Sequence, residues 1–260
     1  MTQAVSYSLL DPTGNVTILV ESPIAESEQA RLAQQLMLLE PDAEQVGFVT
    51  QADDGVFLRM AGGEFCGNAT MSAALLYLLR NGRPEEMVTV HVCGTPEPIA
   101  VNVDAIAEGI WRGTVKMPSP LAIDYECFPG GERLPVVRFP GISHVILENN
   151  LETDKAEQLA SEWCRYLEAD ALGLMFLNQS QGRLKPLVYV PAADTLFWES
   201  SCASGTTAVG AYLAAKENRA VSISLEQPGG RLEIQAQPEG ALYLSGTVQI
   251  RKNGVEAFPD

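Results

Sequence analysis

Two short segments of this 260-residue chain combine a cysteine with small and polar residues in a matched pattern. Residues 66–70 read CGNAT and residues 202–206 read CASGT, and an apolar stretch that predicts a helix follows each of them. Small residues let the chain turn sharply and leave the backbone N–H groups of the first helical turn exposed. A cysteine there lies at the positive end of the helix dipole, which favours thiolate over thiol. The same N–H groups can bind a carboxylate.

Two such thiols suit the inversion of a carbon stereocentre. Inversion by proton transfer needs a base on one face of the carbon and an acid on the other. A carboxylate cradle would stabilise the charge that builds up as the α-proton leaves, and a closed, dry site would protect the carbanion from water. The pair Cys66 and Cys202 therefore predicts proton-transfer chemistry on a small carboxylic acid.

The other cysteines, Cys93, Cys127 and Cys164, lack this context, so we expect them to be packing residues. A structural disulfide between Cys66 and Cys202 is the alternative for the pair. Five cysteines, an odd number, in a chain without a recognisable export signal predict reduced thiols in the cytoplasm instead. A redox sensor that uses the pair as a switch is a second class of function.

Charge and composition exclude several other classes. Seventeen Lys and Arg against 33 Asp and Glu give a net charge of −16, so we expect no nucleic acid and no membrane partner. The longest apolar run, residues 73–79, is far too short to span a membrane. With two histidines, no CxxC or HExxH spacing and no glycine-rich nucleotide motif, the sequence predicts no metal site and no cofactor.

The chain also repeats once, weakly, and each half holds a strand, an amphipathic helix, a cysteine-led helix and three further strands. In the first half the expected amphipathic helix buries Leu32, Ala33, Leu36 and Met37. Phe48 and Leu58 are expected in short strand-like pieces. The other expected strands and amphipathic helices are residues 15–21, 27–39, 88–92, 99–103 and 110–117, then 145–148, 154–167, 187–190, 221–225, 231–235 and 242–250.

Both cysteine-led helices are apolar nearly all round, so each must be surrounded by other elements. We therefore predict an α+β fold of two pseudo-symmetric halves, each a curled, mainly antiparallel sheet around a central helix. The proline-containing segment 117–120 (MPSP) separates an N-terminal half, residues 1–118, from a C-terminal half, residues 119–260. The last strand, about residues 247–260, could cross back to the first half.

These motifs resemble the diaminopimelate epimerase-fold family of cofactor-independent, two-cysteine racemases and epimerases. Besides both cysteine motifs, the resemblance includes residues 12–15 (PTGN), 141–144 (GISH) and 227–230 (QPGG). Diaminopimelate epimerase itself has Gly-Asn-Pro-His in place of GISH. It also has Glu-Arg-Gly and further residues where FWESS, residues 197–201, leads straight into Cys202. The missing Asn and Arg would hold the distal end of diaminopimelate.

Longer strings are similar to the histidine racemases of staphylopine-type opine metallophore biosynthesis, namely residues 12–20, 44–48, 64–72 and 198–202. This similarity implies a cofactor-independent racemase that interconverts L- and D-histidine. A diaminopimelate epimerase, or a racemase of another amino acid, is the alternative within enzymes. An isomerase or non-catalytic relative of the same fold is a further one, which the presence of both cysteines disfavours.

The resemblance also implies roles for individual residues and partners. Cys66 and Cys202 would be the catalytic acid and base, acting on a small-molecule amino-acid substrate, and a homodimer is compatible with the sequence. For three of the binding residues a purely structural role is the alternative: a turn for Asn15, core packing for His144 and a solvated acid for Glu199. The implied substrate-binding residues are Asn15, Gly67, Asn68, His144, Glu199, Ser204, Gly205 and Thr206.

Overall fold

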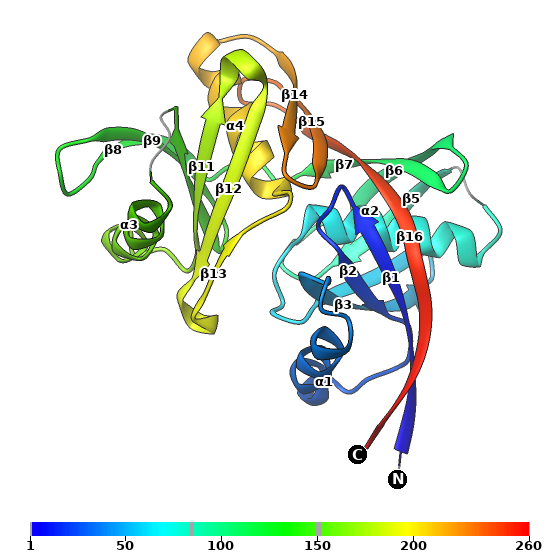
Figure 1. The fold of residues 1–260 in the computed structure, drawn as a ribbon. Helices are drawn as coiled ribbons and strands as arrows, with labels where there is room; N and C mark the ends of the chain where they lie inside the picture. Colours follow the sequence, from blue (N-terminus) through cyan, green and yellow to red (C-terminus); the bar gives the residue numbers. More distant parts are fainter. Residues whose placement is uncertain (1, 84–85, 149–151, 260) are drawn as a thin grey trace. The chain divides into compact units, whose positions relative to one another are not determined.

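The computed structural model describes residues 2–83, 86–148 and 152–259 and divides the chain into two compact units. Unit 1 comprises Met1–Lys116 and Ser245–Asp260, and unit 2 comprises Met117–Leu244. The fold is mixed α+β, with four α-helices among the described residues (Figure 1). None of the helices in the described ranges combines the length and apolar character that a membrane span requires.

The described strands form one 16-stranded sheet, in which the strands of unit 1 follow the order β1-β2-β3-β4-β5-β6-β7, with β16 paired to β1. The β2–β3 and β4–β5 pairs are parallel, whereas β1–β2, β3–β4, β5–β6 and β6–β7 are antiparallel. The elements are β1 (Thr2–Pro12), β2 (Thr17–Val20), α1 (Glu26–Leu39), β3 (Gln45–Ala52), β4 (Gly55–Met60), α2 (Gly67–Arg80), β5 (Glu86–Val92), β6 (Ile99–Ala107), β7 (Ile110–Met117) and, at its C-terminal end, β16 (Leu242–Pro259).

Unit 2 contains the strand order β15-β14-β12-β11-β10-β9-β8, with β13 paired to β12. Here the β10–β11 and β12–β14 pairs are parallel. The elements are β8 (Ala122–Cys127), β9 (Arg133–Phe139), β10 (Ile142–Leu147), α3 (Thr153–Tyr166), β11 (Leu172–Asn178), β12 (Arg183–Val190), β13 (Thr195–Trp198), α4 (Ala203–Glu217), β14 (Val221–Gln227) and β15 (Gly230–Ala236); two 3-10 turns cover Gln179–Gln181 and Pro191–Ala193.

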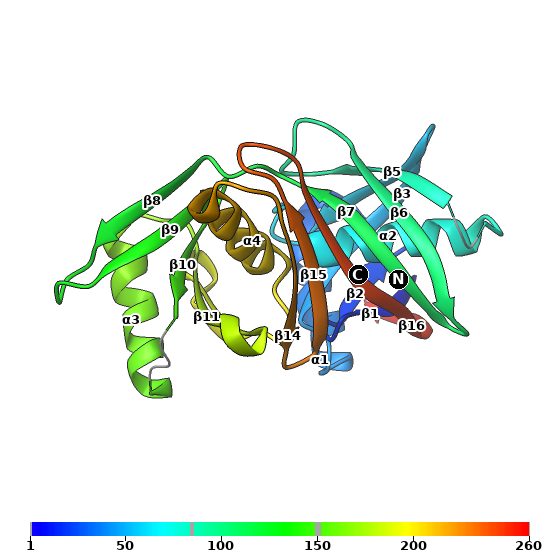
Figure 2. The same cartoon turned by 90° about the horizontal axis from the view of Figure 1, so that it is seen from above.

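The two cysteine-led helices are enclosed, as their apolar sequences predict. Every position from Gly67 to Leu76 of α2 is buried, and so is every position from Gly205 to Ala214 of α4. Helix α2 packs against β1, β2, β4, β5 and β6 of its own unit. Helix α4 packs against β9, β10, β11, β14 and β15, which flank it in Figure 2.

The amphipathic helices cover separate cores. On α1, Leu32, Ala33 and Leu36 are buried in a cluster with strand residues of unit 1. Met37 is 36% exposed, so its predicted burial is wrong. At 100° per residue Met37 lies about 90° from the centre of the buried stripe, which places it at the edge of the apolar face. The apolar face predicted for α3 is confirmed: Ala156, Ala160 and Trp163 are buried, with Leu159 and Leu167 packed against them.

The strands differ from the predicted ones chiefly in number and length. The predicted strand 15–21 shortens to β2, and β16 continues to Pro259 rather than ending at residue 250. Strands β1, β8, β9, β11 and β13 were not predicted. Residues Val248–Pro259 of β16 run antiparallel to β1, from Thr2 opposite Pro259 to Pro12 opposite Val248, so Thr2 and Pro259 lie side by side (Figure 1).

Candidate active site

Cys66 is the N-cap of α2, as the sequence predicts. Its backbone is extended, with φ −132° and ψ 115°, and its Sγ accepts the Ala69 N–H at 3.5 Å. The Cys66 carbonyl accepts the Thr70 hydroxyl at 2.7 Å and the Thr70 N–H at 2.9 Å. The thiol is half-buried, whereas Gly67, Asn68 and Thr70 are buried. Backbone geometry therefore holds the sulfur at the helix start.

Cys202 caps α4 with the same geometry in unit 2. Its φ and ψ are −119° and 109°, and its Sγ accepts the Gly205 N–H at 3.3 Å. The Cys202 carbonyl accepts the Thr206 hydroxyl at 2.7 Å and the Thr206 N–H at 3.0 Å. A Cβ on Gly205 would lie 2.1 Å from Met175 Sδ and 3.1 Å from Cys202 Sγ, which explains the glycine in CASGT. Cys202 itself is buried.

The side-chain hydroxyls of Thr70 and Thr206 both donate hydrogen bonds within their own helix starts. Each hydroxyl has a single proton, and Thr70 and Thr206 both donate it to the cysteine carbonyl four residues earlier. A carboxylate at either helix start would therefore have to be bound by backbone N–H groups rather than by these side chains.

Gln227, at the end of β14, joins the Cys202 site. Its Oε1 accepts the Cys202 N–H at 2.9 Å, and its Nε2 donates to Thr206 Oγ1 at 2.8 Å. All three residues are buried. Sequence reasoning used Gln227 only as part of QPGG and missed this role, because nothing local links position 227 to position 202.

The protonation of Cys202 differs from the expectation. Burial, followed by the charge of Glu199 and a hydrogen bond to its carboxylate, raises the pKa of the Cys202 thiol well above its usual value. Hydrogen bonds from Ser204 and from the Gly205 N–H act in the opposite direction but do not outweigh them. The helix start alone favours the thiolate, so the expectation of a thiolate is wrong for Cys202 in this structure.

His144, on β10, lies against the same site. It is completely buried, and its Nε2 is 3.0 Å from Ser204 Oγ, which is in turn 3.5 Å from Cys202 Sγ. Burial lowers the pKa of His144 to about 3, so the ring is neutral at ordinary pH. The structure brings His144, Glu199 and Ser204 together around Cys202.

Asn15 lies in unit 1, in the turn between β1 and β2. It is buried; its Nδ2 donates to Glu44 Oε2 at 2.5 Å and its Oδ1 accepts Gln45 Nε2 at 2.6 Å. The turn is tied to β16, because Thr13 Oγ1 donates to the Thr247 carbonyl at 3.1 Å. The amide of Asn15 is therefore fixed by its neighbours, and both a turn role and a ligand-facing role are compatible with this placement.

The remaining cysteines divide into different settings. Cys164 is buried and its thiol donates to the Ala169 carbonyl at 3.2 Å, which confirms a packing role. Cys127 is exposed on β8, the last strand in the sheet order, so the packing prediction is wrong there. Cys93 is half-buried and accepts a hydrogen bond from Arg59 Nη1 at 3.5 Å.

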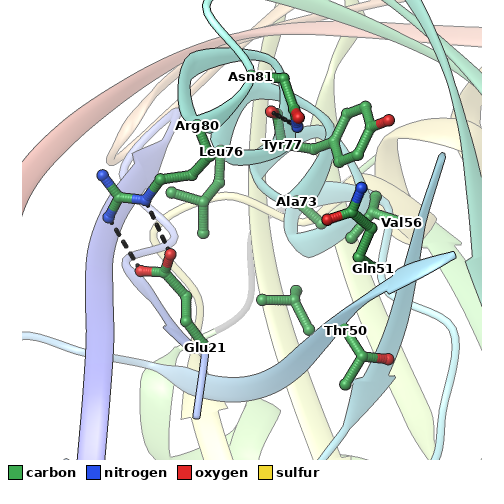
Figure 3. Close-up of a pocket in the computed structure, with 10 residues that line it drawn as sticks. Glu21, Thr50, Gln51, Val56, Ala73, Leu76, Tyr77, Arg80 and Asn81 are labelled. Carbon is green, nitrogen blue, oxygen red and sulfur yellow. Dashed lines mark hydrogen bonds and ion pairs between the residues drawn. The ribbon is translucent and has the colours of Figure 1, made fainter.

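A cavity of about 170 Å³ lies in unit 1 at the other end of α2. Arg80 and Glu21 form an ion pair at its edge, with Nε 2.8 Å from Oε2, and Tyr77, Gln51 and Thr50 also line it (Figure 3). Fourteen residues at 1.5 Å per residue separate the helix ends by about 20 Å, so this cavity is not part of the Cys66 site. Within the described ranges, no group of three or more His, Cys, Asp and Glu side chains could hold a metal ion.

Solved structures with the same fold define the class of protein. A predicted epimerase from Pseudomonas aeruginosa is 17% identical, with a TM-score of 0.71 over 96% of this chain and 98% of that one. A probable proline racemase from Agrobacterium radiobacter K84 is 13% identical, with a TM-score of 0.69 over 98% and 93%. A PhzF-family protein from Bacillus anthracis is 15% identical, with a TM-score of 0.69 over 98% and 99%. The chain thus has the mixed α+β fold of PhzF and proline racemase structures, which is diaminopimelate epimerase-like.

Sequence comparison identifies the family within this fold. The model of the histidine racemase CntK N-terminal domain matches residues 4–257. A histidine racemase of Fusobacterium nucleatum is 33% identical over 263 residues, covering 97% of each chain. One from Staphylococcus aureus is 30% identical over 252 residues, covering 90% of this chain and 89% of that protein. The chain belongs to the histidine racemase CntK family, which confirms the resemblance found in its sequence.

Proposed function

We propose that this chain interconverts L- and D-histidine by moving the α-proton between two cysteine thiols, Cys66 and Cys202. The observation that carries the mechanism is the matched capping of α2 and α4: each helix of a buried pair begins at a cysteine whose sulfur accepts an N–H three residues later. Membership in the histidine racemase family supports histidine as the substrate. In this proposal the two units are pseudo-symmetric halves, divided near residue 118, each a curled sheet around its cysteine-led helix.

The proposed carboxylate site consists of backbone N–H groups in the first turns of the two helices. Gly67 and Asn68 supply them from α2, and Ser204 supplies one from α4. The N–H groups of Gly205 and Thr206, which the resemblance also implies, already donate to the Sγ and the carbonyl of Cys202. Backbone N–H groups in the first turn of a helix bind anions because these groups and the helix dipole point the same way. They would stabilise the negative charge that spreads onto the carboxylate when the α-proton leaves.

The proposed proton transfers balance without a cofactor. A thiolate takes the α-proton from one face, and the C–H electron pair stays on the carbanion. The opposite thiol then donates its proton to the other face, and the two sulfurs have exchanged protonation states. The raised pKa of Cys202 supports the neutral thiol, the acid, as its resting form, so Cys66 would start as the base.

Glu199 and Asn15 complete the proposed pocket. Glu199 holds the thiol form of Cys202 by charge and by a hydrogen bond. Asn15 would line the unit 1 side through its fixed turn. His144 has no exposed surface with which to touch a substrate, so we assign it a different part below. The chemistry needs reduced thiols, which is the reason to place the enzyme in the cytoplasm.

The test is incubation of the full chain with L-histidine in D2O. We expect D-histidine to form and α-deuterium to enter the product, as two-thiol inversion requires. Cys66→Ala and Cys202→Ala should each abolish both signals, while Cys93→Ala retains them. A parallel reaction with diaminopimelate should show no exchange. Absence of α-deuterium and D-histidine with the unaltered chain would exclude the proposed substrate, and full activity of either catalytic variant would exclude the mechanism.

A further inference from the structure

A chain of three polar side chains connects the core of unit 2 to the sulfur of Cys202. His144 Nε2 lies 3.0 Å from Ser204 Oγ, and Ser204 Oγ lies 3.5 Å from Cys202 Sγ. Both distances are within hydrogen-bond range, the second because sulfur is large. His144 is completely buried, so its only route to the reaction is through Ser204.

The surroundings of His144 decide which ring nitrogen carries the proton. Gly173, the partner of His144 in the parallel β10–β11 pair, lies flat against the ring: a Cβ there would be 2.2 Å from Nδ1. Phe139 covers another side, with ring centroids 6.0 Å apart. Nδ1 is buried and has no hydrogen-bond partner in the described part of the chain. Buried N–H groups without an acceptor are rare in proteins, so the single proton of the neutral ring belongs on Nε2.

This tautomer fixes the direction of the other hydrogen bonds. With the proton on Nε2, His144 donates to Ser204 Oγ, and the Ser204 hydroxyl proton is left to point at Cys202 Sγ. The Gly205 N–H donates to the same sulfur at 3.3 Å. A sulfur that receives two donors is stabilised as the thiolate.

We propose that His144 and Ser204 position and stabilise the Cys202 thiolate through a directed chain, His144 Nε2–H to Ser204 Oγ–H to Cys202 Sγ. The inference rests on the proposed two-thiol function and deepens it. Cys202 has to become a thiolate in every catalytic cycle, and the chain supplies a hydrogen bond that is strongest in that state. Ser204 contacts the reacting sulfur, whereas His144 is a positioning residue.

The titratable groups that face Cys202 oppose one another. Glu199, in the segment that leads into α4, favours the thiol by charge and hydrogen bonding. Neutral His144, from β10, acts through Ser204 toward the thiolate. The side chain of Met175 on β11 and the amide of Gln227 on β14 contribute no charge. Removing the hydrogen bonds that connect His144 through Ser204 to Cys202 should therefore shift Cys202 further toward the thiol.

The experiment follows alkylation of Cys202 by iodoacetamide between pH 7 and 11 in the full chain without substrate, with each cysteine resolved by peptide mass spectrometry. Ser204→Ala should slow Cys202 alkylation about fivefold at pH 8, because the thiolate fraction falls. His144→Leu should slow it by a similar amount, and the double variant should be no slower than Ser204→Ala alone. Ser204→Thr, which keeps the hydroxyl, should restore the original profile.

Matched controls separate this effect from general damage. Thr207→Val removes another buried hydroxyl from α4, one that donates to the Ala203 carbonyl, and should leave the Cys202 profile unchanged. Cys66 should keep its own profile, and an unchanged circular dichroism spectrum reports that each variant is folded. An unshifted profile in Ser204→Ala, or additive effects in the double variant, would contradict the proposed hydrogen-bond chain from His144 to Cys202. Because no histidine is present, a shifted profile in a protein that fails to racemise histidine would instead contradict only the proposed function.

Discussion

The two cysteine-capped helix starts share a backbone and differ in their side chains. In both, the sulfur accepts an N–H three residues later and the cysteine carbonyl accepts a threonine hydroxyl four residues later. Cys202 is buried and is joined by Gln227, Ser204 and Glu199, whereas Cys66 is half-buried. The backbone thus sets where each thiol lies, and burial together with the neighbouring Glu199 raises the pKa of the Cys202 thiol.

This asymmetry suits a reaction that is itself symmetric. A two-base racemase that uses cysteines holds one thiol and one thiolate between turnovers. Which sulfur acts as the base depends on the direction of the racemisation. Identical surroundings would leave the proton shared between both sulfurs. In the proposed two-thiol reaction, the burial of Cys202 and the charge of Glu199 would keep the resting proton on Cys202.

Gln227 makes two buried hydrogen bonds at the Cys202 helix start, so its removal should have the largest effect on stability among the substitutions below. Gln227→Leu leaves the Cys202 N–H and one hydroxyl contact of Thr206 buried without a partner, and should lower the free energy of unfolding by about 3 kcal/mol. Urea denaturation measures the loss. Gln235→Leu, on an exposed position of the neighbouring strand β15, should change it by less than about 0.5 kcal/mol. Equal losses of unfolding free energy in the two variants would show that the hydrogen bonds of Gln227 do not stabilise the Cys202 helix start.

A methyl group at Gly173 tests whether packing against His144 controls Cys202. Gly173→Ala places the methyl 2.2 Å from His144 Nδ1, while the control Gly210→Ala places one 2.5 Å from Ile234 Cγ1, away from His144. Both should destabilise the chain by about 2 kcal/mol through overpacking. Only Gly173→Ala should also move the alkylation profile of Cys202 to higher pH. A shift in both variants would show that the profile follows general strain.

The buried histidine of unit 2, His144, should make the stability of the chain depend on acid. Burial lowers the pKa of His144 to about 3, so the unfolded chain binds a proton there between about pH 6.5 and 3 that the folded chain does not. Stability from this group is complete above pH 6.5 and is lost as the pH falls through that window. Between pH 7 and 5 the unaltered chain should lose about 2 kcal/mol more than His144→Leu does.

His91 provides the control for that measurement. It is partly exposed and its Nε2 lies 2.7 Å from Asp54 Oδ1. Unfolding of His91→Leu, followed at several pH values, gives the acid dependence of the chain when His144 is its one remaining histidine. If the dependence disappears with His91 and survives in His144→Leu, the assignment to the buried ring is wrong.

The smallest expected effect is the difference in stability between valine substitutions of the equivalent threonines, Thr70 and Thr206. Thr70→Val removes one bond, to the Cys66 carbonyl, whereas Thr206→Val removes the corresponding bond and also leaves Gln227 Nε2 without an acceptor. Thr206→Val should therefore be more destabilising by about 1 kcal/mol in thermal or urea unfolding. A larger loss for Thr70→Val would reverse the comparison between the helix starts.

The helices could be predicted from the sequence better than the strands. Amphipathic spacing located α1 and α3, and all-round apolar character identified α2 and α4 as buried. Strand β11 was missed because its sequence, LGLMFLN, is apolar at nearly every position and is buried on both faces. Such a run shows no alternation, so its periodicity does not distinguish a strand from a buried helix.

Within the site, local motifs were readable and contacts between distant residues were not. The cysteine-led patterns predicted both helix caps. Gln227 lies 25 positions from Cys202, and His144 lies 60 from Ser204, so only the folded chain shows these contacts. The expectation of a thiolate failed for Cys202 because it considered the helix dipole without the burial and the Glu199 charge that oppose it.

Strand β16 has a consequence for synthesis on the ribosome. Unit 2 is one continuous segment, Met117–Leu244, whereas unit 1 needs Ser245–Asp260 to pair with β1. Chains emerge from the amino end at about 5–20 residues per second and their domains fold as units. Strand β1 must therefore wait, unpaired along one edge, until β16 emerges. The half encoded first is the half completed last.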